Sequence, residues 1–525
     1  MAFSLVVKLL PMAALLAFPF LTTSYSAYQL GLYLLYGIVG QGIALCWGNG
    51  GFLPLGQALF FGIGAYISGK ILQGNIGWGV VILALILSVI IPALIAGFIG
   101  ALVFDRQIGS GPYFSLITLA LSLLGYQLAN SQVLLTGGFN GLTGINGLPG
   151  IDSYGNLYFF IVGALAVSTL FLSHLVSTPF GQLLAAVREN EERLQFLGVK
   201  TSRVKAAAFA MSGALAGMAG AFFAPHQGIV TPQVVGFILS AELVIWTAVG
   251  GRFGPVGPVV GAVIIGFLAS GLRDSFAYWE VVVALVFIIV VLRLPGGVGG
   301  LGISIAKRFG INVWSQKKFS RTEIVPGADQ KESPTLEFDN VSVQIGPVAI
   351  LSGLSFSIKQ TGIHCLIGPN GAGKTSALNA LTGKLPYSSG KISWRGNTLK
   401  GIRPFRTSGL GIGRKLQVPS IFPGLTIRQN IDIAIWVNRL KFTHLFSLKP
   451  YQWNISLLDE LQDSFPFLKD NEELAGTLSV GQRQMLDFTM AVLAEPNLIL
   501  LDEPCAGLSK SETENMISVI SNLAR

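Results

Sequence analysis

The chain has 525 residues, of which 51% are hydrophobic and only 12% are charged, and its formal net charge is +9. Its mean hydropathy of +0.62 excludes an ordinary soluble multidomain protein and is typical of a membrane protein. The first 300 residues contain only eleven Lys or Arg and eight Asp or Glu, so most charges follow them. The positive excess shows no basic stripe interleaved with aromatic residues; we therefore expect no nucleic-acid partner, but attraction to anionic lipid.

About ten apolar stretches in the first 300 residues could each cross a membrane, because a span needs about 20 mainly apolar residues. They lie at 3–23, 27–46, 54–74, 78–103, 113–130, 156–176, 204–226, 237–250, 254–272 and 277–294. The eighth is the weakest candidate because it is short. The first resembles a signal peptide, but Lys8 lies inside it and further spans follow at once, which favours a transmembrane helix.

The one long charged insert between spans, residues 178–205, indicates the orientation. It contains Arg188, Glu189, Glu192 and Arg193. Because basic loops remain in the cytoplasm, ten spans place both termini and the C-terminal half on the cytoplasmic side of a multi-pass protein of the cytoplasmic membrane. Apolar residues recur in the insert at helical spacing, which predicts an amphipathic helix that could dock on the soluble half and carry its motion to the spans. An ordinary solvated loop helix is the alternative.

The spans contain closely spaced glycines, and one of the spans contains the carboxylate of Glu242. Glycines three or four residues apart in 212–224 and 254–271 predict close packing between helices. Glu242 is a carboxylate inside an apolar segment, which is costly in a membrane, and is therefore a candidate for the transport path. It could instead lie near an interface, where it would pair with Arg252 or cap a short helix.

Composition divides the chain into a membrane domain at 1–300, a basic and polar linker at 301–334 and a soluble domain at 335–525. Cys46, Cys365 and Cys505 have neither paired nor metal-ligand spacing. Neither a disulfide framework nor a zinc site is expected.

The soluble half contains the sequence IHCLIGPNGAGKTSALNAL, which predicts an apolar strand, a G-x-x-x-x-G-K-T loop and a helix. In such a loop backbone amides wrap phosphate oxygens, Lys374 reaches the terminal phosphates and the Thr375 hydroxyl binds Mg²⁺. The cofactors predicted are ATP and Mg²⁺. The predicted nucleotide-binding residues of the loop are Gly368, Pro369, Asn370, Gly371, Ala372, Gly373, Lys374, Thr375 and Ser376.

Downstream, NLILLDEP predicts a buried strand that ends in two acids. Asp502 is placed to hold Mg²⁺, and Glu503 to orient or deprotonate the attacking water. The two acids could instead cap a helix, but the P-loop upstream favours catalysis.

Between these motifs, LSVGQRQMLDFTMAVLAEP resembles the signature sequence of ATP-binding cassette proteins, and the order P-loop, signature, acidic strand is that of the family. The resemblance implies an α/β P-loop domain of the ABC ATPase type, preceded here by a multi-span helical membrane domain. It implies that Ser479, Gly481 and Gln482 close on nucleotide held by a partner cassette. Gln417 matches the family's glutamine loop, which contacts Mg²⁺ and water, and Ile345 stands where an aromatic residue usually stacks on adenine.

The cassette departs from the family pattern in two further places. Ser509 stands where many cassettes carry an aspartate. The switch histidine of the family would follow one more helix and strand, whereas the sequence ends at Arg525. We expect an incomplete gene product rather than a deliberately short ATPase.

The membrane half contains GQALFFGIGAY, GPYFSLITLAL, LTGGFNGLTGI, TPFGQLLAAVRENEERLQFLGV and LRLPGGVGGL, which together resemble permease subunits of branched-chain amino acid importers. That group includes urea and short-amide importers, and ELVIWTAVGGR looks closer to them; branched-chain amino acids remain the first expectation. The resemblance implies ATP hydrolysis coupled to import, with a second permease subunit, a second cassette and an extracytoplasmic substrate-binding protein as partners. An exporter and a non-hydrolysing regulatory membrane ATPase remain alternatives.

Overall fold

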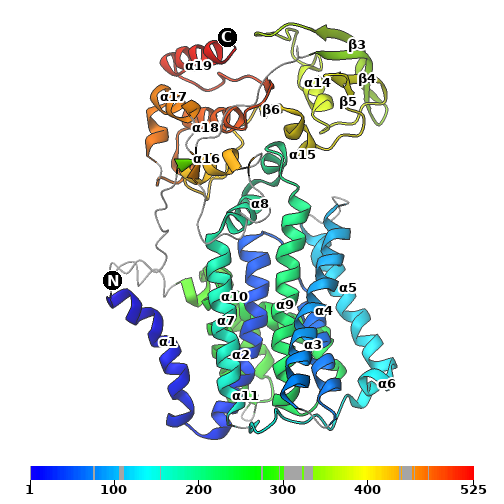
Figure 1. Ribbon diagram of the computed structural model, residues 1–525, viewed down its shortest axis with the longest axis vertical. Coiled ribbons are helices and arrows are strands. Elements are labelled where there is room, and N and C mark those ends of the chain that lie inside the picture. Colours follow the sequence, from blue (N-terminus) through cyan, green and yellow to red (C-terminus); the bar gives the residue numbers. More distant parts are fainter. Residues whose placement is uncertain are drawn as a thin grey trace. The chain divides into compact units, whose positions relative to one another are not determined.

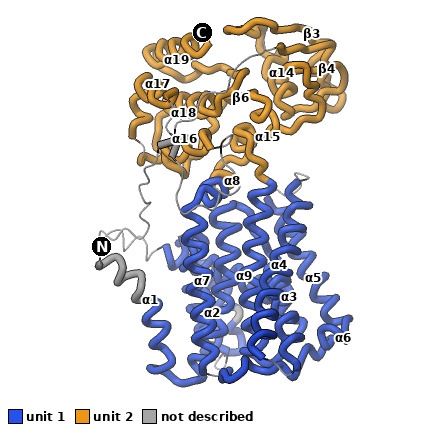
Figure 2. The backbone as a smooth tube through the Cα atoms, viewed as in Figure 1, with its two compact units in different colours: residues 1–184, 202–317 blue, residues 185–201, 318–525 orange. Residues whose placement is uncertain are grey.

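The computed structural model describes residues 2–74, 77–105, 111–153, 155–273, 276–294, 296–300, 322–323, 335–436, 439, 452–453, 456–470 and 472–524. The chain divides into two compact units, which Figure 2 shows in different colours. The first comprises residues 1–184 and 202–317, and the second residues 185–201 and 318–525. Apart from 322–323, the predicted linker at 301–334 lies outside the described residues.

The regular secondary-structure elements in the described part of the first unit are helices (Figure 1). Its α-helices are α1 (Ala2–Leu21), α2 (Ser24–Ala44), α3 (Gln57–Ile71), α4 (Trp78–Asp105), α5 (Pro112–Ser131), α6 (Val133–Thr136), α7 (Leu157–Ser177), the start of α8 (Pro179–Phe196), α9 (Thr201–Gln227), α10 (Phe237–Gly250), α11 (Val256–Arg273) and α12 (Trp279–Arg293). A helix lies in each of the ten predicted ranges. Among the described residues, six helices are long and apolar enough to cross a membrane: α2 with its π-helical continuation to Asn49, α4, α5, α7, α9 and α11.

Burial within this unit distinguishes inner helices from outer ones. Helix α2 packs against α7, α10 and α11, and 83% of its apolar window is buried. Only 28% and 22% of the corresponding windows of α4 and α5 are buried, and these helices direct leucines outward. Apolar side chains on an outer surface are stable in lipid, so this distribution fits a membrane domain.

The prediction of close glycine packing is confirmed. On α9, a Cβ added to Gly217 would overlap the carbonyl oxygen of Ser88 on α4. On α11, a Cβ at Gly261 would overlap the carbonyl oxygen of Trp246 on α10. Only glycine permits these backbone approaches, which give helices the van der Waals contact on which association in a membrane depends.

A buried amide links three segments of the same unit. Gln41 of α2 is fully buried, and its Nε2 donates to Thr169 Oγ1 at 2.7 Å and to the carbonyl of Pro255 at 3.0 Å. Its Oε1 accepts from Ser168 Oγ at 2.7 Å. The amide therefore has partners for both of its ends, as a group shielded from water requires.

The second unit combines strands and helices. Its strands are β1 (Thr322–Glu323), β2 (Leu336–Ile345), β3 (Val348–Ile358), β4 (Ser389–Trp394), β5 (Asn397–Thr398), β6 (Ile412–Lys415), β7 (Gln452–Trp453) and β8 (Leu498–Leu501). Its helices are the remainder of α8, α14 (Lys374–Leu381), α15 (Pro404–Thr407), α16 (Ile427–Trp436), α17 (Ser456–Ser464), α18 (Val480–Leu493) and α19 (Lys510–Leu523). The sheets are an antiparallel one of order β3-β2-β4-β5, the parallel pair β6-β8, and the short pair β1-β7.

The core of the second unit lies between the antiparallel sheet and α14. Phe338 and Val341 of β2, Ile392 of β4 and Leu381 of α14 belong to one buried cluster, which also includes Leu500 of β8. Alternate residues of β2 are buried in part of the strand, as expected of a strand that packs on one face. The cluster joins the strand that ends in the acids to the helix that follows the P-loop.

One predicted element is absent. Residues 363–367 are expected to form the strand before the P-loop, but they have no regular secondary structure, and no described strand pairs with them. Ile363 is 58% exposed and Ile367 is 89% exposed. Strand pairing is what turns an extended apolar segment into a strand, and without a ladder the local sequence preference is insufficient.

Candidate functional site

The P-loop leads directly into α14. Gly371 and Gly373 have positive φ values of 85° and 84°, and a Cβ at Gly373 would overlap the side chain of Leu351. Lys374 Nζ donates to the carbonyls of Gly368 and Pro369, each at 2.8 Å, so the loop curls around the ammonium group. The first turn of α14 follows the loop directly, and the free backbone N–H groups of a helix N-terminus suit phosphate. Of the other predicted residues, Thr375 and Ser376 are half-buried and Asn370 is exposed.

The two predicted acids follow β8, which is half-buried rather than buried as expected. Asp502 is half-buried, and its Oδ2 is a buried oxygen without a hydrogen-bond partner among the described residues. An unpartnered carboxylate oxygen fits a ligand of Mg²⁺, which prefers oxygen donors. Glu503 is exposed and has a positive φ of 48°, a conformation that costs about 1–3 kcal/mol in a residue other than glycine and is often found at functional sites.

The parallel pair β6-β8 places the glutamine loop beside these acids. Its register sets Lys415 opposite Leu501, the last residue before Asp502. Because the strands are parallel, Gln417 and Asp502 both follow the carboxyl end of the pair. Gln417 is exposed, and its carbonyl accepts a long hydrogen bond of 3.4 Å from Gln484 of α18.

The predicted signature residues form the start of α18. Ser479 is the N-cap: its hydroxyl accepts from Gln482 N, and the Gln482 side chain accepts from Ser479 N, which makes a capping box. Ser479 is exposed, whereas Gly481 is buried. Ile345, at the end of β2, is 52% exposed, so the predicted base-binding position is open to solvent.

In the first unit, Glu242 is half-buried on α10. It lies one turn before Trp246, whose ring is 5.1 Å from that of Tyr36. The guanidinium group of Arg252 lies 5.0 Å from the Trp47 ring and 5.1 Å from the Phe253 ring.

Residues 185–201, which we call the inserted segment, fold with the cassette. The amphipathic helix predicted within 178–205 is present as α8, but it is kinked at Asn190, which has φ −158° and ψ 87°, and α9 already begins at Thr201. Asn190 Oδ1 accepts from Arg193 N at 2.9 Å, and its Nδ2 donates to Ser420 Oγ at 2.8 Å. The asparagine side chain thus replaces helical hydrogen bonding and starts a second helical turn.

The side chain of Arg193, in the inserted segment, is completely buried. Its Nη1 donates to the carbonyl of Arg414 at 2.7 Å, and its Nη2 donates to the carbonyl of Asp487 at 2.8 Å. Nη2 also forms an ion pair of 2.9 Å with Asp487 Oδ1, and both side chains are fully buried. The guanidinium therefore joins β6 to α18.

The other predicted charges of the inserted segment lie nearer its surface. Glu189 Oε2 accepts from Gly424 N at 3.1 Å, while its Oε1 pairs with Arg188 at 2.7 Å. Glu192 forms an ion pair with Lys384, just beyond α14. Each of the two acids therefore contacts a different part of the cassette.

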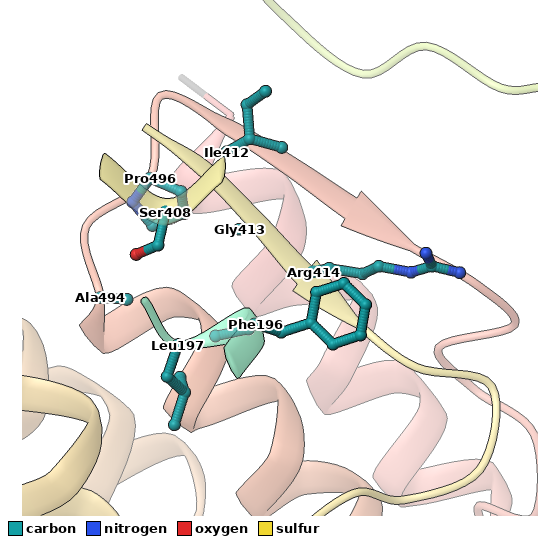
Figure 3. A pocket seen from close by; sticks show the side chains of 9 residues that line it. Phe196, Leu197, Ser408, Ile412, Gly413, Arg414, Ala494 and Pro496 are labelled. Atoms are coloured by element: carbon teal, nitrogen blue, oxygen red, sulfur yellow. The ribbon is translucent and has the colours of Figure 1, made fainter. Parts of the chain in front are cut away.

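Apolar residues complete this contact. Figure 3 shows Phe196 and Leu197 at a pocket that is also lined by Ser408, Gly413 and Pro496. The Phe196 ring lies 5.4 Å from the guanidinium group of Arg414. Both apolar side chains are almost completely buried, so the segment packs as part of the cassette core.

Burial shifts the pKa values of Arg193 and of the charged residues near it. Burial lowers the pKa of Arg193 and raises the pKa of Asp487, and in each case the opposite charge of the partner resists the shift. Burial also lowers the pKa of Lys415, which Asp487 counteracts most strongly. Burial lowers the pKa of Arg414 as well, and Asp502 is the main opposing charge. From the inserted segment to Asp502, basic residues thus interact with acidic ones: Arg193 and Lys415 with Asp487, and Arg414 with Asp502.

Two candidate functional residues, Asp487 and Asn190, were not predicted from the sequence. Asp487 is the only acid in the apolar run of α18, and a lone buried acid usually has a charged partner, so its position was a usable signal. Asn190 carried no such signal, because its contact with Ser420 joins residues 230 positions apart.

Comparison with known families decides the identity of the chain. Residues 26–292, about half of the chain, match the family of the branched-chain amino acid transport system permease component. The chain belongs to this family. Residues 351–506 of this permease chain match the ABC transporter family, so it joins a permease to an ATP-binding cassette.

The cassette of this permease chain also resembles individual transport ATPases. It is 33% identical over 191 residues to the high-affinity branched-chain amino acid transport ATP-binding protein BraG of Pseudomonas aeruginosa, covering 36% of the chain and 77% of BraG. It is 30% identical over 188 residues to the ribose import ATP-binding protein RbsA of Lactococcus lactis, covering 36% of the chain but only 37% of RbsA. The predicted ABC ATPase class is thereby confirmed.

Solved structures similar to this part include an ATP-binding cassette of an ABC transporter in its ADP conformation, with 22% identity and a TM-score of 0.31. That alignment covers 37% of the permease chain and 78% of the solved chain.

Proposed function

We propose that this chain is one half of an ATP-driven importer, in which the inserted segment carries the nucleotide-dependent movement of the cassette to the membrane helices. The observation that supports this most directly is the burial of Arg193 within the cassette, eight residues before α9 begins at Thr201. A solvated loop helix would leave this charge in water, because burying a charge is costly unless a partner such as Asp487 compensates it. ATP binding then acts through differential affinity for two conformations, and hydrolysis resets the cycle.

The nucleotide chemistry rests on a small group of residues. Lys374 and the P-loop backbone bind the phosphates, and Thr375, Gln417 and Asp502 would hold Mg²⁺, which supplies charge neutralisation at the terminal phosphates. Glu503 orients the attacking water or accepts its proton. The unpartnered Asp502 oxygen supports this assignment.

The substrate class proposed first is branched-chain amino acids, which the permease family match and the likeness to BraG support. Urea or a short amide comes second. A second permease, a second cassette and an extracytoplasmic binding protein complete the transporter, because Ser479, Gly481 and Gln482 act on the nucleotide of a partner cassette. The spans lie in the cytoplasmic membrane, with the cassette and both termini inside.

Lys374→Ala tests the assignment in whole cells. Labelled leucine should enter cells that express the wild-type transporter and its partners, and Lys374→Ala should reduce uptake to background with normal membrane insertion. Exposed Lys359→Ala is the matched control and should leave uptake unchanged. Normal uptake by Lys374→Ala would sink the proposal. ATP-dependent efflux of leucine would point to an exporter, and competition by urea alone would reassign the substrate.

The metal assignment has a readout that does not depend on transport. Mn²⁺ bound with ATP is visible by electron paramagnetic resonance, and its signal with the purified transporter should be lost in Asp502→Asn but retained in Asp463→Asn, an exposed aspartate of the same cassette. An unchanged Mn²⁺ signal in Asp502→Asn would remove Asp502 from the metal site.

A further inference from the structure

We propose that Arg193 is a positioning residue that clamps β6 to α18 and thereby sets the spacing between the glutamine loop, the signature helix and the P-loop helix. The proposal rests on the proposed coupling role of the inserted segment, but it assigns that role to a single guanidinium group and to two backbone carbonyls.

The clamp is built from the two arms of the guanidinium fork. One arm donates to the carbonyl of Arg414 on β6, and the other donates to the carbonyl of Asp487 on α18. The acceptors belong to different elements, so one planar group with two directed donors holds both. The ion pair with the Asp487 carboxylate compensates the charge that this position buries.

Each end of the clamp continues into a predicted nucleotide motif. Strand β6 ends two residues before Gln417, and α18 begins directly after Ser479. The side chain of Arg414 extends the linkage, because its Nη1 donates to Thr382 Oγ1 at 2.7 Å and more weakly to the carbonyl of Leu378 at 3.4 Å. Leu378 lies in α14 and Thr382 is the C-cap of that helix. Arg193 thus connects, directly or through one further arginine, to the elements that carry all three motifs.

The position of Arg193 is itself held by other residues of the second unit. Asn190 accepts from the Arg193 backbone N–H and is anchored to Ser420, so the side chain enters the cassette from a fixed turn. Phe196 and Leu197, one turn later, are also buried. A change in the spacing of β6 and α18 therefore displaces this turn, and with it the residues that precede α9.

Two substitutions separate the clamp from a merely buried charge. Arg193→Lys keeps a cation for Asp487 but lacks the fork, so it cannot hold the two carbonyls in the same geometry. Arg193→Met removes both the charge and the fork. Lys469→Met removes a cation from an exposed ion pair of the same cassette and is the matched control.

The readout is hydrogen exchange of α9 amides in the purified full-length transporter, with and without MgATP, because this signal requires no transported substrate. In the wild type and in Lys469→Met, MgATP should change exchange in the first turns of α9 by about threefold or more. In Arg193→Lys, ATP should bind within about twofold of the wild-type affinity, but the change in α9 should disappear. A response of Arg193→Lys equal to that of the wild type would overturn the clamp alone. Absence of any ATP-dependent change in the wild type would overturn the proposed coupling function as well.

Discussion

Arg193 and Asp487 form an ion pair of 2.9 Å in which both side chains are completely buried, although 294 residues separate them in the chain. By contrast, the ion pair between Lys469 and Asp463 has a similar N–O distance of 2.8 Å, but both of its side chains are more than half exposed. Water screens the second pair and not the first, so the two pairs should differ greatly in their effect on stability.

We expect Arg193→Met to destabilise the cassette by about 3–5 kcal/mol, because it leaves the Asp487 carboxylate buried without its partner. Lys469→Met should cost no more than about 1 kcal/mol. Thermal unfolding of the purified transporter, followed by circular dichroism, compares the two variants. Equal midpoints for both variants would contradict the assignment of Arg193 to the cassette interior.

Glu503→Gln should slow ATP hydrolysis by about 10²- to 10⁴-fold, because the amide cannot accept a proton from the attacking water. Nucleotide binding should persist, since Glu503 is not among the predicted phosphate or metal ligands. Glu495→Gln is the control: Glu495 also has a positive φ, of 51°, and pairs with Arg439 rather than with nucleotide. Phosphate release by the assembled transporter measures both variants, and a comparable loss in Glu495→Gln would indicate a structural cause.

Gly217→Ala should destabilise the membrane unit by about 1–3 kcal/mol, because the added methyl group would overlap the backbone of α4. Gly163→Ala is the matched control, since nothing lies within 4 Å of a Cβ at that position of α7. That variant should be neutral or slightly stabilising, because alanine favours helix. Aggregation temperature in detergent, measured by size-exclusion chromatography, separates the two; identical temperatures would exclude tight packing at Gly217.

Asp432 should make stability depend on pH. Burial raises the pKa of this carboxyl from 3.8 to about 7, and Arg428, at 3.8 Å, only partly opposes the shift. Between pH 4 and pH 7 the folded protein therefore keeps a proton that the unfolded chain has lost, so this contribution is complete below about pH 4 and disappears as pH rises through 7. The thermal unfolding midpoint of the wild type, measured relative to that of Asp432→Asn, should decrease as the pH is raised from 5 to 8. A constant difference would show that Asp432 titrates normally.

The spacing of apolar residues and motifs along the sequence was sufficient to predict the helical membrane fold and the cassette family. Helices form from local hydrogen bonds and must be apolar in lipid, so ten apolar ranges predicted ten helices. The P-loop and the signature are local as well: Gly373 and the capping box at Ser479 work through neighbours a few residues away. Their chemistry could therefore be predicted from consecutive residues.

Contacts between residues far apart in the chain could not be predicted from local sequence. The apolar segment 363–367 has the local composition of a strand but has no described ladder partner, and local propensity cannot supply one. The inserted segment was predicted to be amphipathic, yet neither its kink at Asn190 nor the partner of Arg193 could be inferred. Local sequence determines which helices and loops can form, whereas the burial of Arg193 against Asp487 depends on the three-dimensional packing of β6, α18 and the inserted segment, because only that packing removes water from both charges.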